Sequence, residues 1–88
     1  MDIRNTYELQ ARYDSRQSFY GKALVEEGEG KKTLYSYLTE VAIVEEGGKA
    51  ILREEAICSQ TTIRHVREFV RQETGRVLSK KDMRGLIA

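Results

Sequence analysis

The chain has 88 residues, of which 40% are hydrophobic and 33% are charged, and its formal net charge is +1. These values exclude general disorder, and a chain of this length buries roughly 60 to 65% of its unfolded surface, enough for one modest core. We therefore expect a single domain over residues 1–88. No signal-peptide h-region and no apolar run of membrane-spanning length is present, which favours a cytoplasmic protein without membrane contact.

Alternating and β-branched residues before residue 58 predict an antiparallel sheet of about four strands, arranged as a meander over residues 5–58. The predicted strands are residues 6–14, 18–25, 33–44 and 49–57. The third of these is the longest apolar segment and is expected to form the central strand. Gly47 and Gly48 indicate a tight hairpin between the last two strands. Gly21 interrupts the second strand, so we expect it to lie under a helix.

The register of that hairpin predicts which sheet face is buried. A turn centred between Glu46 and Gly47 sets Val41 opposite Leu52 and Glu40 opposite Arg53. The face expected in the core carries Tyr35, Tyr37, Thr39, Val41, Ile43, Ala50 and Leu52. The other face carries Leu34, Leu38, Ala42 and Val44, which a thin helix layer would leave uncovered.

At Ser59 the apolar period changes from two to about 3.6, which predicts an amphipathic helix over about residues 60–74. Ser59 is expected to cap its start and Gly75 to end it. A second, shorter helix is expected at about residues 80–87. The predicted fold class is therefore α+β, with the sheet packed by a C-terminal helix and a short second one.

Charge is unevenly distributed along the chain. Residues 1–58 carry eight Lys or Arg and eleven Asp or Glu, whereas residues 59–88 carry seven and three. Within the basic part, Arg64, Arg67 and Arg71 recur at helical spacing and form one stripe, which Lys80 and Lys81 would extend. Such a stripe could follow a nucleic-acid backbone. The alternative is a solvated helix face, because Glu68 lies within pairing distance of the stripe.

Hydroxyls gather at the start of the predicted helix, where Ser59, Thr61 and Thr62 stand beside free backbone N–H groups. An anion could bind there because unsatisfied donors and the helix dipole both favour negative charge. Simple capping explains the same residues without a ligand.

Cys58 and His65 are the only residues of their kinds in the chain. A single histidine without a ligand set at metal spacing predicts no metal site, and no cofactor motif is present. A Cys58/His65 nucleophilic pair is disfavoured, because His65 lies well into the helix and points along it. The sequence therefore indicates a protein that is not an enzyme.

Three segments resemble those of a known group of proteins. They are Ser18-Phe19-Tyr20-Gly21-Lys22-Ala23, Leu34-Tyr35-Ser36-Tyr37-Leu38-Thr39-Glu40-Val41-Ala42 and Ser59-Gln60-Thr61-Thr62-Ile63-Arg64-His65-Val66-Arg67-Glu68-Phe69. Together they resemble small uncharacterised phage and mobile-element proteins of Gram-positive bacteria, which have a YSYxTxVA strand and an SxTTxRHxxEF helix start. Leu38 stands where that group is expected to have a polar residue such as asparagine.

The resemblance implies a genomic setting in which small accessory proteins bind host or element-encoded macromolecules. We therefore expect a non-catalytic protein-binding module, with inhibition of a host defence system as one role. It could form a homodimer through the outer sheet face or a free strand edge. The alternative function is nucleic-acid binding through Arg64, Arg67, Arg71, Lys80 and Lys81.

Overall fold

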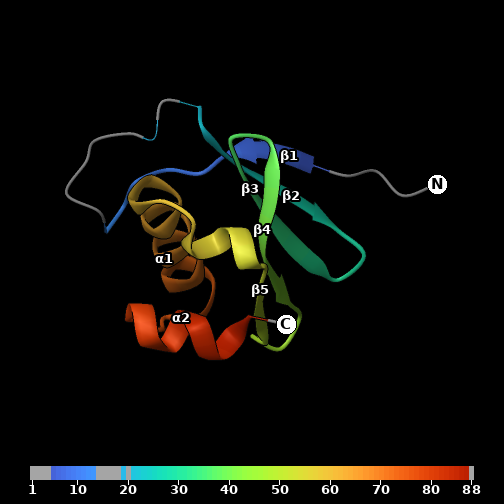
Figure 1. Ribbon diagram of the computed structural model, residues 1–88. Coiled ribbons are helices and arrows are strands. Elements are labelled where there is room, and N and C mark those ends of the chain that lie inside the picture. Colours follow the sequence, from blue (N-terminus) through green and yellow to red (C-terminus); the bar gives the residue numbers. More distant parts are fainter. Residues whose placement is uncertain (1–4, 14–18, 20, 88) are drawn as a thin grey trace.

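The computed structural model describes residues 5–13, 19 and 21–87, and has the α+β architecture that the sequence predicts. Five antiparallel strands form one sheet in the order β1-β2-β3-β4-β5, which is a meander. The strands are β1 (Asn5–Glu8), β2 (Ala23–Gly28), β3 (Lys31–Ser36), β4 (Thr39–Glu45) and β5 (Ala50–Leu52). Helix α1 (Gln60–Thr74) covers one face of the sheet, and α2 (Lys80–Leu86) lies beside α1 and β5 (Figure 1).

The sheet has one strand more than predicted because a turn divides residues 33–44 between β3 and β4. The prediction of a single central strand over these residues is therefore wrong. Tyr37 and Leu38 occupy this turn with φ values of 51° and 68°. Positive φ at both central positions is typical of the type I′ hairpin turn, in which Asn and Gly predominate. Because Tyr and Leu stand there instead, the sequence carries no turn signal and reads as an unbroken strand.

The hairpin register is also one residue away from the prediction. Ala42 pairs with Leu52, and Ile43 pairs with Ile51, because the turn between β4 and β5 is shifted by one position. A bulge between Leu34 and Tyr35 changes the pairing of β3 with β4 as well. A shift of one residue exchanges the two faces of a strand. The predicted core face is therefore wrong for β3 and β4, although Val41 is buried, and it is right for Ala50 and Leu52 of β5.

On β3 and β4 the residues that pack under α1, Leu34 and Ala42, are ones expected to be uncovered, whereas Leu52 of β5 was expected in the core. A ladder of buried residues crosses this face of the sheet from Val25 through Leu34 and Ala42 to Leu52. These four join Val66 and Phe69 of α1 in the hydrophobic core. Tyr37 and Thr39, which were expected in the core, are exposed at the turn.

Strand β5 is shorter than the predicted fourth strand over residues 49–57. After Leu52 the chain forms a 3₁₀ helix, η1 (Glu54–Ile57), which places Ala56 in the core. The Arg53 N–H still donates to the Val41 carbonyl at 2.9 Å, and pairing ends there. The 3₁₀ turn redirects the chain from the sheet into the start of α1.

Helix α1 has both of the caps expected from the sequence. The Ser59 hydroxyl accepts a hydrogen bond from the Thr62 N–H at 3.1 Å, and Gly75 adopts a left-handed conformation with φ of 79°. The expected apolar arc, Ile63, Val66, Phe69 and Val70, is buried. Helix α2 begins at a capping box formed by Ser79 and Asp82 and ends at Leu86, after which Ile87 forms a parallel bridge with Leu52.

The first strand ends earlier than predicted, at Glu8, and the chain then runs from the sheet to α1 (Figure 1). Gly21 does not lie under a helix: no atom would come within 4 Å of a Cβ there, and its φ of +73° is the property that favours glycine. The expected turn at residues 14–16 and the start of the second strand lie outside the described residues. No helix in the described ranges is long and apolar enough to cross a membrane.

Candidate anion-binding pocket

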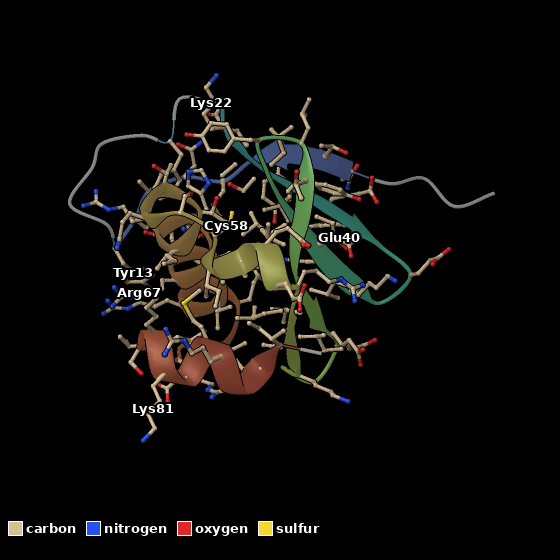
Figure 2. The ribbon with its side chains drawn as sticks, viewed as in Figure 1. Tyr13, Lys22, Glu40, Cys58, Arg67 and Lys81 are labelled. Carbon is tan, nitrogen blue, oxygen red and sulfur yellow. The ribbon has the colours of Figure 1, made fainter. Side chains whose placement is uncertain are left out.

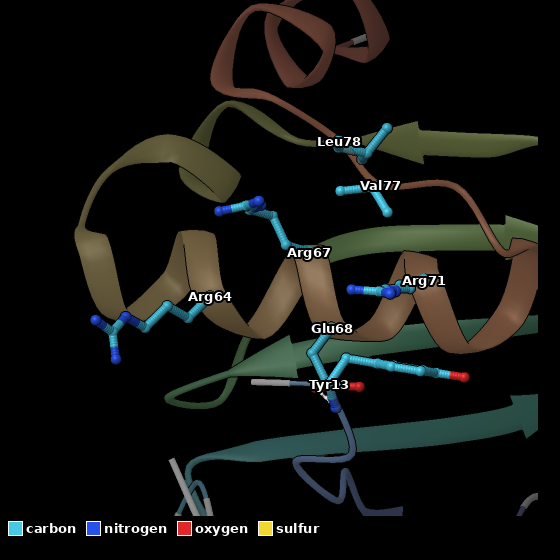
Figure 3. A pocket seen from close by; sticks show the side chains of 7 residues that line it. All are labelled: Tyr13, Arg64, Arg67, Glu68, Arg71, Val77 and Leu78. Carbon is cyan, nitrogen blue, oxygen red and sulfur yellow. Dashed lines mark hydrogen bonds between the residues drawn. The ribbon is translucent and has the colours of Figure 1, made fainter. Parts of the chain in front are cut away.

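The arginine stripe of α1 lines a surface pocket of about 270 Å³. Its walls are formed by Tyr13, Arg64, Arg67, Glu68, Arg71, Val77 and Leu78 (Figure 3). They come from three segments: the chain that follows β1, one face of α1 and the connection to α2. Helical spacing puts the three arginines on one face, and the flanking segments turn that face into a hollow.

Glu68 of α1 holds the segment that contains Tyr13 against the helix. Its side chain is only 3% exposed, and its Oε1 accepts a hydrogen bond from the Tyr13 N–H at 2.8 Å. The Gln72 Nε2 donates to the other carboxylate oxygen at 2.6 Å and to the Gln10 carbonyl at 2.6 Å. These bonds, which we call the Glu68 clasp, hold residues 10–13 against α1.

The rim of the pocket combines positive charge with apolar surface. The guanidinium of Arg71 lies 4.3 Å from the centre of the Tyr13 ring, a cation–π contact (Figure 3). Tyr13 and Val77 are 55% and 60% exposed. Arg67 and Arg71 are exposed, whereas Arg64 is half-buried. A guanidinium fork and an apolar surface are therefore available to the same ligand.

The charges around the pocket favour an anion. Three guanidinium groups line it together with one carboxylate, that of Glu68, whose two oxygens already accept hydrogen bonds. Guanidinium binds carboxylate or phosphate through two parallel hydrogen bonds and stays charged over the whole physiological pH range. The pocket is chemically suited to a carboxylate or a phosphate group.

A second group of polar side chains lies under the start of α1. Ser36 Oγ lies 2.8 Å from His65 Nδ1 and 3.1 Å from Thr62 Oγ1, and the Phe19 ring packs edge-on against His65 at 4.7 Å. A serine beside a histidine is the arrangement of a nucleophile and its base. Here, however, Ser36 and His65 are 2% and 1% exposed, so a substrate could not reach them. The geometry is that of a buried tie between β3 and α1.

A family model described as a family of unknown function, DUF8033, matches residues 7–85. The chain belongs to DUF8033. No curated protein and no solved structure matches it.

In this DUF8033 chain the predicted site residues separate into three groups. Arg64, Arg67 and Arg71 line the pocket together. Ser59 and Thr62 are used internally: Ser59 caps α1, and the buried Thr62 contacts Ser36, while Thr61 is exposed.

The two predicted lysines lie apart from that pocket. Lys80 and Lys81 are exposed in the first turn of α2 and do not line it, although Lys81 lies on the same side of the molecule as Arg67 (Figure 2). Cys58 is exposed before α1, whereas the imidazole of His65 is buried. The described residues contain no group of three or more His, Cys, Asp or Glu suited to a metal ion.

The sequence did not reveal three of the seven residues that line the DUF8033 pocket. Tyr13 was expected in the first strand, and Val77 and Leu78 were given no role. No local signal could have placed Tyr13 here, because its contact with Glu68 joins residues 55 positions apart. Val77 carried a weak signal, since an apolar residue between two helices is unexpected in a solvated connection.

Proposed function

We propose that this domain is a non-catalytic protein-binding module, and that the arginine pocket binds an acidic segment of its partner. The supporting observation is that Arg67 and Arg71 share one hollow with two exposed apolar side chains, Tyr13 and Val77. Interface hot spots are enriched in arginine and tyrosine, and a carboxylate side chain next to an apolar one would match both halves of this surface.

A protein ligand fits the pocket better than a nucleic acid does. One face of the Tyr13 ring is covered by Arg71, so that face offers no platform for base stacking. The resemblance to phage and mobile-element proteins favours a host protein as the partner, with a component of a defence system as the specific candidate.

Nucleic-acid binding is the second candidate function. It is supported by the position of Lys81 on the side of the molecule that carries Arg67, which would lengthen the cationic surface beyond the pocket (Figure 2). Neutralised phosphates would make such binding fall steeply with added salt.

Fluorescence anisotropy with labelled probes tests both candidates. The probes are a glutamate-rich peptide that contains leucine and tyrosine, single-stranded DNA and RNA, and duplex DNA, all at the same salt concentration. We expect the peptide to bind most tightly. The double variant Arg67→Ala/Arg71→Ala should weaken its binding by at least about a hundredfold, since each of the two charge-assisted pairs contributes about 1.5 kcal/mol or more.

The matched control is the double variant Lys31→Ala/Lys49→Ala, which removes two positive charges from exposed positions outside the pocket. This control should bind the peptide as the parent does. Equal losses in the two double variants would show unspecific attraction and contradict the proposal. Tighter binding of a nucleic acid than of the peptide would favour the second candidate.

A further inference from the structure

The two edges of the sheet differ in how they are closed. At one edge, β5 is bridged by Ile87, and α2 packs beside it. At the other edge lies β1, all four residues of which are exposed. An unprotected strand edge offers a row of backbone donors and acceptors to another strand.

The pairing of β1 with β2 determines which of its backbone groups point outward. The Leu9 N–H donates to the Ala23 carbonyl at 2.9 Å, in line with the pairing of Tyr7 with Val25. Because these groups alternate along an antiparallel strand, the N–H and C=O groups of Thr6 and Glu8 point away from β2. Within the described part of the chain, no hydrogen bond is formed by these outward groups.

The outer edge of β1 also lacks several of the features that prevent pairing. It contains no proline and no lysine, and the described strand is not interrupted by a bulge. Thr6 and Tyr7 are residues with high strand propensity, and Tyr7 remains 39% exposed on the side of the sheet that α1 covers.

We propose that β1 pairs with β1 of a second copy of this chain, antiparallel, with Tyr7 facing Tyr7 of the partner subunit across a twofold axis. In this register the outward groups of Thr6 bond those of Glu8 in the other subunit, so about four backbone hydrogen bonds form. The two tyrosine rings form a cross-strand aromatic pair, and Glu8 lies opposite threonine rather than another glutamate. The alternative pairing of Glu8 with its own copy would oppose two like charges.

A second copy fits this edge for two reasons. The strand is complementary to itself in the proposed register, which is what a twofold interface requires. The net charge of +1 produces little repulsion between copies. The dimer does not depend on the arginine pocket, because no residue of β1 lines that pocket.

Sedimentation velocity over a range of concentrations tests the dimer. We expect the parent chain to dimerise and Thr6→Pro to be monomeric. Proline at this position deletes only an outward N–H and leaves the ladder with β2 intact. Thr6→Ala keeps the N–H and should dimerise like the parent. A parent chain that stays monomeric at every concentration would overturn the proposal.

Disulfide cross-linking tests the register of the β1–β1 pairing. It does not depend on whether the Thr6→Pro variant folds. With Cys58→Ser as background, Tyr7→Cys should give a covalent dimer on mild oxidation. Residues directly opposite at a non-hydrogen-bonded position have Cα atoms about 4.5 Å apart, within the range of a disulfide. Thr6→Cys in the same background should cross-link poorly, since its partner is Glu8. Cross-linking of neither variant, or mainly of Thr6→Cys, would contradict the proposed pairing.

Discussion

Leu38 holds a backbone conformation that its side chain disfavours. Its φ of 68° lies in the left-handed region, and the side chain is 84% exposed. Burial of this side chain therefore contributes almost nothing that could offset the backbone strain. A non-glycine residue in this region costs about 1 to 2 kcal/mol. Tyr37 shares the conformation, but the centre of its ring lies 6.0 Å from the centre of the His65 ring, and the Lys22 ammonium lies over it. Leu38 is therefore the position at which the turn can be relaxed.

We predict that Leu38→Gly raises the free energy of unfolding by roughly 1 kcal/mol, because glycine adopts a positive φ without steric cost. Urea denaturation followed by circular dichroism measures the change. Leu38→Ala is the control: it removes the same exposed side chain but keeps the Cβ that causes the strain, so no gain is expected. Equal stabilisation by both substitutions would assign the effect to lost hydrophobic exposure instead.

Helix α2 is stabilised at its first turn by the capping box of Ser79 and Asp82. The Ser79 N–H donates to Asp82 Oδ2 at 3.0 Å, and the Ser79 hydroxyl accepts from the Asp82 N–H at 3.1 Å. The Ser79 backbone N–H, and after it the Ser79 side chain, hold the pKa of the Asp82 carboxyl below its usual value of 3.8. The ionised carboxylate thus stabilises α2, which in turn places Met83 in the core.

Because the pKa of Asp82 is lowered in the folded state, the contribution of this carboxylate to stability depends on pH. It is fully present above pH 3.8 and is lost as the pH falls through the lower pKa of the folded protein. We predict that Asp82→Asn removes this part of the acid dependence, because an amide oxygen accepts the same hydrogen bond at every pH. Unfolding midpoints in urea, measured from neutral to strongly acidic pH, provide the comparison. Parallel curves for parent and variant would contradict the prediction.

Elements with local signals could be predicted, and elements fixed by distant partners could not. Helix α1 follows from Ser59, Gly75 and the apolar arc between them, all of which lie in one continuous segment of the sequence. The sheet faces follow instead from a bulge at Leu34 and from a turn without glycine at Leu38. A one-residue error in register is enough to exchange the faces, even when the strands themselves are recognised.

The candidate site divides in the same way. The arginine stripe could be read from the sequence because helical spacing alone determines which residues share a face. Tyr13 could not, since its position depends on the Glu68 clasp and on where β1 ends. Prediction therefore gave the charged side of the pocket but not its aromatic rim.

At the scale of the whole molecule, the two proposals have a joint consequence. The twofold axis between the paired antiparallel β1 strands is perpendicular to the sheet, so α1 of both subunits lies on the same face of the combined sheet. Both arginine pockets would then be presented on one side of the dimer. A surface that carries several acidic segments could occupy both pockets at once.

We predict that the parent chain binds a dense layer of the immobilised acidic peptide roughly a hundredfold more tightly than Thr6→Pro does. The two proteins should bind the free peptide in solution with equal affinity, because each pocket is unchanged. Surface plasmon resonance and anisotropy provide the two measurements. Weaker binding of free peptide by Thr6→Pro would show that the substitution damages the pocket, whereas equal binding to the layer would argue against two pockets acting together.

The Glu68 clasp also has a consequence for the order in which the chain folds. Strands β2 to β5 are joined by short turns, so their hairpins close with little loss of chain entropy. The hydrogen bond between Tyr13 and Glu68 closes a loop of 55 residues and requires α1 to be in place. We therefore expect residues 9–13 to dock after the rest of the core, and their amide hydrogens to become protected from exchange last during refolding.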